Sequence, residues 1–302
     1  MRVTLTGGTG FIGRALARRL LEEGDAVHLL ARRRPEGTEP RAAFSVWDAA
    51  AGDPPLESLE HTQAVIHLAG EPVAQRWSEA AKARIRASRV EGTRRLVGAL
   101  ARLERPPGVL VSASAIGIYG SRGDEWLTES SPPGHGFLAE VVRQWEREAQ
   151  AAEALGLRVV RLRIGVVLSR EGGALARMLP AFRAGLGGRL GSGRQWMSWI
   201  HLEDLVKLIL FAVRTPGLRG PVNAVAPHPA TNAEFTRALA AALRRPAFWR
   251  VPGFLLRALF GEMASVLLDS QRVRPEAALA AGFRFRRPEL AEALRDLLGR
   301  AG

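Results

Sequence analysis

The sequence has 302 residues, 47% of them hydrophobic and 24% charged, which is enough apolar material for a sizeable core in one large or two modest domains. It contains no cysteine, so disulfides, thiolate zinc sites, iron–sulfur clusters and cysteine nucleophiles are excluded. The formal net charge is +13, but the arginines are scattered along the chain without a nucleic-acid-binding motif, and we expect no nucleic-acid partner.

Histidine spacing and the length of the hydrophobic runs exclude two further classes. The six histidines are His28, His61, His67, His135, His201 and His228. No two of them stand at a ligand spacing such as i, i+4, so we expect no metal site. No apolar run reaches the ~20 residues that cross a bilayer, and the chain begins with a strand pattern instead of a signal peptide. We therefore expect a soluble, cytoplasmic protein without a membrane span.

Short apolar runs alternate with longer helical patterns in the first half of the chain. In chain order these segments are 3–6, 11–23, 26–31, 64–68, 79–103 and 109–113. Such alternation is typical of β-α-β units that form a parallel sheet with helices on both faces. A helix over 136–155 is expected to lead into a strand at 158–163, and a further strand is expected at 222–225.

The first strand is followed at once by a glycine-rich turn. Gly7, Gly10 and Gly13 stand between this strand and an amphipathic helix. In that context the first glycine permits a tight turn, the second lets the backbone approach a pyrophosphate, and the third allows helix and strand to pack closely. The helix N-terminus offers unpaired N–H groups to the phosphates. The sequence therefore predicts a dinucleotide site on a Rossmann-type fold.

Three arginines, Arg32, Arg33 and Arg34, follow the second expected strand. An acidic residue at this place, about 20 positions after the glycines, normally holds the ribose hydroxyls of NAD. Guanidinium groups instead pair with a 2′-phosphate, which a carboxylate would repel. The sequence therefore predicts NADP(H) as the cofactor, with Arg32 and Arg33 as binding residues. A solvated arginine run is the alternative.

The texture of the sequence changes after about residue 165. Glycine-rich loops at 185–188 and 191–193 indicate a lobe built over the mouth of the sheet, and a helical tail begins near 246. We expect an α/β fold with a doubly wound parallel sheet in a Rossmann domain at 1–165. A smaller C-terminal substrate lobe is expected at 166–302, from which the strand at 222–225 returns to the sheet.

Several motifs together resemble those of the extended short-chain dehydrogenase/reductase superfamily. They are the glycine turn, His67-Leu68-Ala69-Gly70, Ser112-Ala113-Ser114 before Tyr119-Gly120, and the stretch 199–204. The segments 70–72, 191–195 and 271–283 look like markers of its atypical, epimerase-like branch, the NAD-dependent epimerase/dehydratases. The resemblance extends over essentially the whole chain.

This resemblance implies roles for individual residues. The residues implied to line the pyrophosphate are Gly7, Gly10, Phe11, Ile12 and Gly13, and those implied to lie along the cofactor are Leu68, Ala69 and Gly70. Ser112 and Ser114 stand where the superfamily has its catalytic serine. Ser114 is the better candidate because of its distance from Tyr119, whereas Ser112 is equally compatible with a serine that ends a strand.

The chain departs from the superfamily at the proton relay, which is a Tyr-x-x-x-Lys pair on the helix after the serine. On the corresponding helix, 136–146, phenylalanine or leucine stands for the tyrosine and valine for the lysine. The single tyrosine is Tyr119, and both lysines lie elsewhere in the sequence. Glu140, on the same helix, is a candidate general base, and Tyr119 a candidate proton donor. The alternative for Glu140 is an exposed charge on the helix surface, and the alternative for Tyr119 is a residue that only forms the wall of the pocket.

Polar and aromatic residues after the glycine-rich loops are candidates for substrate binding. Arg194, Gln195, Trp196 and Trp199 can place a guanidinium, an amide and indole faces around a polar or ring-bearing ligand. His201 and Asp204 are expected instead to anchor this loop and the next helix by hydrogen bonds.

Two functions remain open from the sequence. The favoured one is an NADP(H)-binding epimerase-like oxidoreductase or isomerase acting on a small hydroxyl- or carbonyl-bearing substrate. In it Ser114 polarises the substrate oxygen, and Tyr119 or Glu140 handles the proton. The alternative is a catalytically inactive dinucleotide-binding regulatory protein, of a kind linked to cell division, which the missing Tyr–Lys pair favours.

Overall fold

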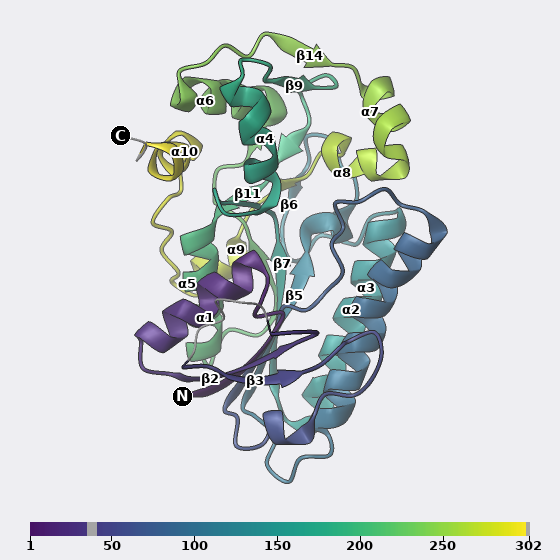
Figure 1. The fold of residues 1–302 in the computed structure, drawn as a ribbon, viewed down its shortest axis with the longest axis vertical. Helices are drawn as coiled ribbons and strands as arrows, with labels where there is room; N and C mark the ends of the chain where they lie inside the picture. The colour runs from purple at the N-terminus through teal and green to yellow at the C-terminus, as the bar shows by residue number, and fades with distance from the viewer. Residues whose placement is uncertain (35–40, 300–302) are drawn as a thin grey trace.

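A seven-stranded parallel sheet forms the centre of the molecule (Figure 1). The computed structural model describes residues 1–34 and 41–299. Across the sheet the strands are β12 (Gly220–Ala224), β7 (Arg158–Ile164), β5 (Val109–Ala115), β4 (Ala64–His67), β1 (Arg2–Thr6), β2 (Ala26–Ala31) and β3 (Ala43–Val46). The order reverses between β1 and β4, and ligands of such sheets bind outside the carboxyl ends of the strands at this point. The predicted doubly wound α/β fold is confirmed.

Helices cover both faces of the sheet because the central strands carry apolar side chains on both faces. The four large helices are α1 (Phe11–Glu22) and α5 (Leu202–Arg214) on one face, and α2 (Glu79–Leu100) and α3 (Phe137–Gln150) on the other. Val3 and Leu5 are buried against Leu16 of α1, whereas Val65 is buried with Leu96 of α2. This double burial is what a parallel sheet requires.

A smaller set of elements lies over one end of the sheet (Figure 1). Its helices are α4 (Gly173–Arg183), α6 (Asn232–Leu243), α7 (Gly253–Phe260), α8 (Ser265–Leu268) and α10 (Leu290–Leu298). Short strand pairs join these helices: β8 (Val166–Leu168) with β11 (Trp199–His201), β9 (Gly188–Leu190) with β14 (Trp249–Val251), and β10 (Trp196–Met197) with β13 (Ala230–Thr231). A separate core that includes Leu175, Phe182 and Phe235 holds them together.

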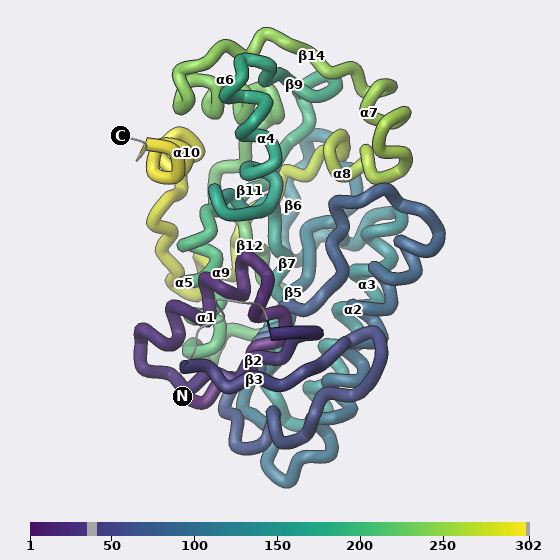
Figure 2. Tube along the Cα trace, viewed as in Figure 1, coloured from purple at the N-terminus to yellow at the C-terminus, as the bar shows by residue number. Residues whose placement is uncertain are grey.

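The C-terminal segment crosses from this set of elements down to the sheet near α9, and its yellow end then returns upward to α10 (Figure 2). Its strand β15 (Arg272–Val273) pairs with β6 (Trp126–Leu127), and α9 (Glu276–Ala280) follows. Ala278 and Phe283 are buried in the same core as α1 and α5. The residues after 165 thus contribute both to the upper lobe and, through α5, β12 and α9, to the body around the sheet.

Two features of the fold were not expected from the sequence. The edge strand β3 is half exposed on both faces, so its four residues lack the apolar run that marks a buried strand. The helix expected over 136–155 ends at Gln150, and a 3₁₀ turn over Ala151–Leu155 continues it. Gly156, at φ +82°, closes that turn in the left-handed conformation that glycine adopts without strain.

A buried histidine ties the end of β4 to its neighbours. His67 is fully buried, with Nδ1 2.7 Å from the hydroxyl of Thr6 and Nε2 2.9 Å from that of Thr93. The Thr6 hydroxyl also accepts a hydrogen bond from the backbone N–H of Ala69, so this cluster fixes the path of the chain after β4. Burial, with a smaller effect of Arg89, lowers the pKa of His67 to about 4.

We expect this low pKa to make the fold sensitive to acid. Between pH 6.5 and 4 the unfolded chain binds a proton at residue 67 that the folded chain does not bind. The free energy of unfolding should therefore be intact above pH 6.5 and fall by about 3 kcal/mol on acidification through this window. Urea unfolding measured across the window should give a shallower pH dependence for His67→Asn than for the parent. Equal slopes would contradict this role of His67.

Candidate functional site

The glycine turn between β1 and α1 is closely packed on one side and open on the other. Gly7 has φ +69°, and a Cβ there would lie 2.7 Å from the carbonyl carbon of Leu68. A Cβ on Gly13 would lie 2.3 Å from the carbonyl oxygen of Gly7. By contrast, the nearest protein atom to a Cβ on Gly10, the N-cap of α1, is 3.4 Å away. Side chains are therefore excluded beneath the turn, while space remains above the N-terminus of α1.

Two cavities lie along the carboxyl ends of the central strands. The first, which we call the glycine-side cavity, has a volume of about 390 Å³. Its wall includes six of the residues predicted to contact the cofactor: Gly7, Gly10, Arg32, Leu68, Ala69 and Gly70. The second, the helix-side cavity, has a volume of about 460 Å³ and is bordered by α3. Leu68 lines both cavities, which are therefore neighbours.

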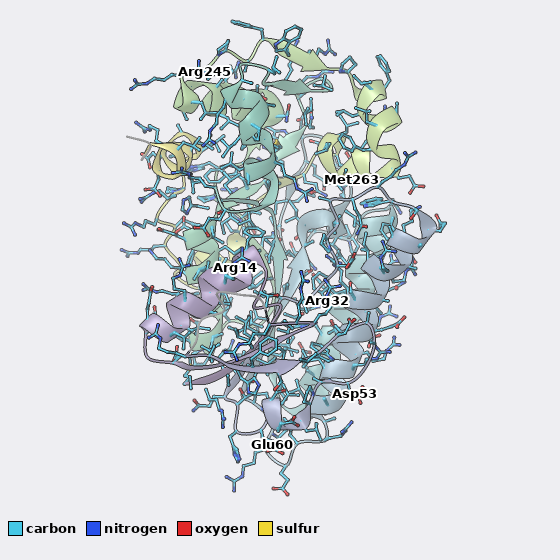
Figure 3. All side chains as sticks on the ribbon, viewed as in Figure 1. Arg14, Arg32, Asp53, Glu60, Arg245 and Met263 are labelled. Carbon is cyan, nitrogen blue, oxygen red and sulfur yellow. The ribbon has the colours of Figure 1, made fainter. Side chains whose placement is uncertain are left out.

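The arginines after β2 differ in their positions. Arg32 lines the glycine-side cavity, near the middle of the molecule in Figure 3, and its Nη1 lies 3.8 Å from Oε2 of Glu71. Arg33 is exposed and borders neither of the two cavities. The guanidinium carbon of Arg34 lies 5.8 Å from the ring centre of Phe44. The predicted arginine cluster therefore places one guanidinium, that of Arg32, at the cavity wall.

Ile12 and Phe11, at the start of α1, are directed to different places. Ile12 lines the helix-side cavity. Phe11 borders neither cavity, and a Cβ on Gly172 would lie 2.8 Å from its ring. The side chain of Phe11 thus packs the glycine turn against the loop before α4, which leaves Ile12 to form the wall.

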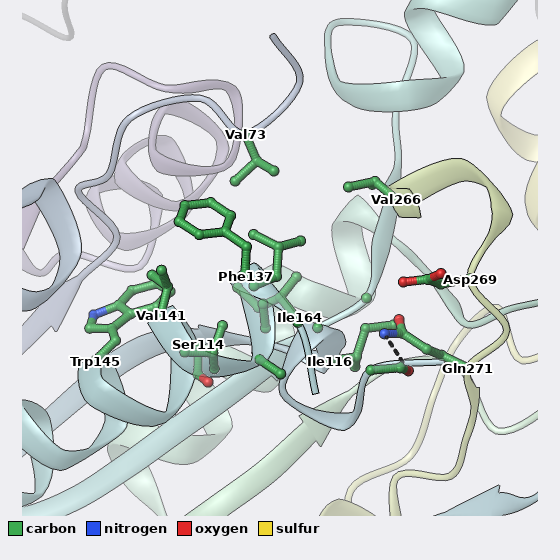
Figure 4. Close-up of a pocket in the computed structure, with 18 of the residues that line it drawn as sticks. Val73, Ser114, Ile116, Phe137, Val141, Trp145, Ile164, Val266, Asp269 and Gln271 are labelled. Atoms are coloured by element: carbon green, nitrogen blue, oxygen red, sulfur yellow. Dashed lines mark hydrogen bonds between the residues drawn. The ribbon is translucent and has the colours of Figure 1, made fainter. Parts of the chain in front are cut away.

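The helix-side cavity is mainly apolar (Figure 4). Phe137 and Val141 of α3 form one wall, and the end of β5 contributes Ser114. Asp269 and Gln271, from the C-terminal segment, lie on the opposite side of the cavity (Figure 4). The cavity therefore combines residues from three distant parts of the chain.

Ser114 is held by a buried network of hydrogen bonds. Its hydroxyl donates to Oε1 of Glu146 at 2.6 Å, and both residues are 3% exposed. Arg163 donates to both carboxylate oxygens of Glu146, at 2.8 and 2.9 Å. Because the serine proton points to Glu146, the lone pairs of the Ser114 oxygen remain for an acceptor role in the cavity.

Tyr119 and Glu140, the two residues predicted to handle a proton, lie away from this cavity wall. The Tyr119 side chain is fully buried, and its hydroxyl donates to Oδ1 of Asn223 at 2.7 Å and accepts from Arg163 at 2.9 Å. Burial raises the pKa of this tyrosine. Glu140 is 45% exposed and lies 3.4 Å from Nη1 of Arg86. The structure therefore brings neither side chain together with Ser114 at the cavity.

Arg89, which the sequence did not single out, borders the helix-side cavity. Burial lowers its pKa to about 10, and no carboxylate in the described chain lies within ion-pair distance of it. Its Nη1 donates to the carbonyl oxygen of Glu71 at 2.9 Å, and its guanidinium lies 5.3 Å from the ring centre of Trp145. A Cβ on Gly70 would be 3.2 Å from this guanidinium. The Glu71 carboxylate acts on this charge from a distance but forms no ion pair with it, so the half-buried guanidinium suits an anionic ligand.

Family models match the chain in two places. Residues 3–224 match the NAD dependent epimerase/dehydratase family, and residues 251–297 match DUF1731, a domain of unknown function. The chain belongs to the NAD dependent epimerase/dehydratase family. The resemblance read from the sequence motifs is thereby confirmed, together with the presence of a distinct C-terminal segment.

Epimerase-family relatives are similar over nearly their whole length. The "Epimerase family protein SDR39U1 homolog, chloroplastic" of Arabidopsis thaliana is 41% identical, over 99% of this chain and 87% of its own. Epimerase family protein YfhF of Bacillus subtilis is 37% identical, over 99% and 98%. The crystal structure of human epimerase family protein SDR39U1 with NADPH has a TM-score of 0.88 and 37% identity, and the match covers 99% of this chain and all of that one.

In this epimerase-family chain the residues of the missing relay form an apolar wall. Phe137 and Val141 are four residues apart on α3, as the tyrosine and lysine of the superfamily pair are. Leu138 and Val142 have the same spacing, and all four side chains line the helix-side cavity. The departure inferred from the sequence therefore lies at the cavity itself. These side chains are apolar, so none of them can exchange a proton with a substrate.

The residues predicted to bind substrate lie elsewhere in the epimerase-family fold. Arg194, Gln195 and Trp196 border a separate open hollow, where the indole N–H of Trp196 donates to Asp124 at 2.7 Å. Trp199 is fully buried and belongs to the core of the upper lobe. None of the four lines the helix-side cavity, and Gln195 itself is buried and donates to the backbone carbonyl of Leu190. The predicted substrate residues are therefore divided between this hollow and the core of the upper lobe.

His201 and Asp204 anchor the start of α5, as expected. His201 is the N-cap residue and accepts from the backbone N–H of Glu203 at 3.1 Å. The carboxylate of Asp204 accepts from the backbone N–H groups of Arg286 and Arg287, at 2.9 and 2.8 Å. These bonds hold the C-terminal segment against the body of the molecule.

The described residues form neither a metal site nor a membrane-spanning helix. No group of three or more histidine, aspartate or glutamate side chains within 1–34 and 41–299 is placed to hold a metal ion. No helix in these ranges is long and apolar enough to cross a membrane.

Proposed function

We propose that the chain binds NADP(H) across the two cavities and acts as an epimerase-like oxidoreductase or isomerase on a small hydroxyl- or carbonyl-bearing substrate. The observation that carries the proposal is that the two cavities share Leu68 as a wall, with the glycine turn and Arg32 in one of them and Ser114 in the other. The NADPH present in the structure of the human relative supports the choice of dinucleotide.

The residues along the cavities suit the parts of such a cofactor. The open side of Gly10, at the N-terminus of α1, can receive a pyrophosphate, and the Arg32 guanidinium a 2′-phosphate. Arg89 supplies a further cation beside Gly70. When bound, the dinucleotide supplies a nicotinamide ring that gives or takes a hydride. This ring belongs in the helix-side cavity, next to Ile12 and Ser114.

Ser114 contributes a fixed hydrogen-bond acceptor to the reaction. Its own proton is donated to Glu146, whose charge is balanced by Arg163. The oxygen lone pairs therefore accept a hydrogen bond from a substrate hydroxyl and orient its carbon toward the ring. This role differs from polarisation of a carbonyl by donation, which would require the serine proton to leave Glu146.

The second candidate function is that of a dinucleotide-binding regulatory protein without turnover. The apolar pair Phe137 and Val141 at the relay position favours it. Oxidation of NADPH in the presence of a panel of aldehydes, ketones and sugars would separate the two functions. Turnover of any of these compounds would show that the chain is not a regulatory protein without catalytic activity.

We expect the exchange Arg32→Asp to remove a preference for NADPH over NADH. The exchange replaces a charge-assisted partner of the 2′-phosphate with a group that repels it, and should weaken NADPH binding about tenfold or more while NADH binding changes little. Isothermal titration of each cofactor into the parent and the variant measures both affinities.

The neighbouring exchange Arg33→Asp is the matched control. It alters the net charge equally, but the side chain lies outside both cavities. A general charge effect would weaken NADPH binding to the same degree in both variants. A parent that binds NADH as tightly as NADPH would refute the preference for the phosphorylated cofactor.

A further inference from the structure

The helix-side cavity needs a proton-exchanging group that α3 does not supply. A carbonyl reduced to a hydroxyl takes up one proton at oxygen, and the reverse reaction releases it. Phe137 and Val141 have no exchangeable side-chain proton, and the Ser114 proton is donated to the buried Glu146. The group must therefore come from another wall of the cavity.

Three ionisable side chains of the described residues line this cavity: Arg89, His135 and Asp269. Arg89 remains charged in the neutral range because its pKa is about 10. His135 is exposed at the rim, in the loop before α3. Asp269 is thus the one carboxyl group on the wall, among residues 1–34 and 41–299.

Asp269 faces the position of the missing tyrosine from the C-terminal segment (Figure 4). It follows α8 directly, and it lines both the helix-side cavity and an adjoining cavity that Phe137 also lines. Within the described chain its carboxyl group forms no hydrogen bond or ion pair. Burial raises the pKa of Asp269, while the charge of Arg257 acts in the opposite direction. The Asp269 carboxyl group can therefore be protonated without donating that proton to another protein group.

We propose that Asp269 is the acid–base residue of the helix-side cavity and exchanges a proton with the substrate oxygen in place of the tyrosine absent from α3. This inference rests on the proposed function. In reduction, the Asp269 O–H bond breaks, a new O–H bond forms on the substrate, and the carbonyl π bond opens as its carbon receives a hydride from bound NADPH. Oxidation runs in reverse, with the Asp269 carboxylate accepting the hydroxyl proton.

Cofactor affinities provide a test that needs no substrate. The nicotinamide ring of NADP⁺ carries a positive charge that NADPH lacks, so ionisation of a carboxyl group beside the ring favours NADP⁺ alone. The 2′-phosphate titrates alike in both cofactors and cancels in their affinity ratio. From pH 4.5 to 8 we expect this ratio to shift toward NADP⁺ by about threefold to tenfold in the parent and to stay flat in Asp269→Asn.

Other charged groups face Asp269 and require controls. Arg257 on α7 and Glu262 line the adjoining cavity, and Lys82 forms an ion pair with Glu262. His135 also lines the helix-side cavity and carries an ionisable ring. His135→Gln and Glu262→Gln should each keep the pH-dependent shift. If either exchange abolishes the shift, or Asp269→Asn keeps it, the assignment of Asp269 is wrong.

Turnover tests proton transfer itself. NADPH oxidation is measured with 9,10-phenanthrenequinone and a panel of aromatic aldehydes. Asp269→Asn should lower kcat about a hundredfold and abolish its pH dependence, with partial recovery in Asp269→Glu. The exposed Asp53, which pairs with Arg102, gives the matched control Asp53→Asn with unchanged kcat.

The outcomes separate this inference from the proposed function. A parent that does not bind NADPH refutes the proposed function. A parent that binds NADPH but turns over none of the probes supports the regulatory function and so overturns the proposed reaction. A parent that turns over a probe no faster than Asp269→Asn does refutes the role of Asp269 alone.

Discussion

Replacing Glu146 with glutamine is expected to lower the free energy of unfolding by about 3–5 kcal/mol, the cost of removing one partner from a buried ion pair. The carboxylate is 3% exposed and accepts hydrogen bonds from Ser114 and Arg163. Without its charge, the Arg163 guanidinium would remain buried and uncompensated. Urea unfolding, monitored by tryptophan fluorescence, measures the change.

A double variant distinguishes this electrostatic cause from a loss of packing. In Glu146→Gln combined with Arg163→Met, the nearer of the two uncompensated cations is removed as well, and Arg161, 3.6 Å from Glu146, remains. We expect the double variant to be more stable than Glu146→Gln alone, although Tyr119 loses one hydrogen-bond donor. If the losses of unfolding free energy in Glu146→Gln and Arg163→Met simply add up to that of the double variant, the ion pair does not account for the loss.

Gly13→Ala is expected to weaken NADPH binding about a hundredfold, because a displacement of ~1 Å in a ligand cradle has effects of this order. The added Cβ would stand 2.3 Å from the Gly7 carbonyl oxygen and 2.6 Å from the Cα of Gly8, so the glycine turn has to move. This overpacking should also lower the free energy of unfolding by about 1–3 kcal/mol. Cofactor titration and urea unfolding of the same preparation measure the two effects.

Two other glycines give matched controls for the added methyl group. Gly10→Ala has room within the protein, since the nearest atom is 3.4 Å away, but its Cβ occupies the space proposed for the pyrophosphate. It should weaken NADPH binding with little loss of stability. Gly98→Ala, on the exposed face of α2, has no atom within 4 Å and should change neither NADPH binding nor the turn. Unchanged NADPH affinity in both Gly10→Ala and Gly13→Ala would contradict the proposed cradle.

The fold was predictable wherever apolar residues recur with the period of a strand or a helix and the elements that pack together are neighbours in the sequence. The β1 and α1 segments lie next to each other, and the glycines that join them have one consistent structural explanation. The short strand pairs outside the central sheet were not predictable in this way. Strands such as β10 and β15 contain two residues each, too few for a period, and their partners lie far away in the sequence.

The candidate site was predictable at the glycine turn and not in the helix-side cavity. Tyr119 contacts Asn223 and Arg163, which are 104 and 44 residues away in the sequence. No local sequence pattern predicts that these partners bury its hydroxyl. Arg89 is one arginine among many in this chain, and its sequence neighbours do not distinguish it from the exposed ones. Asp269 reaches the cavity only because the C-terminal segment returns to it.

The return of the C-terminal segment to the sheet means that this region is not an interchangeable module. It supplies Ala278 and Phe283 to the main core, and its Arg274 carbonyl accepts a hydrogen bond from Asn223 of β12. A chain ending before residue 251 would leave apolar surface of α5 and β12 open to water. Chimeras that exchange this region between relatives therefore have to exchange its contacts on the Rossmann body as well, so the two regions are constrained to vary together.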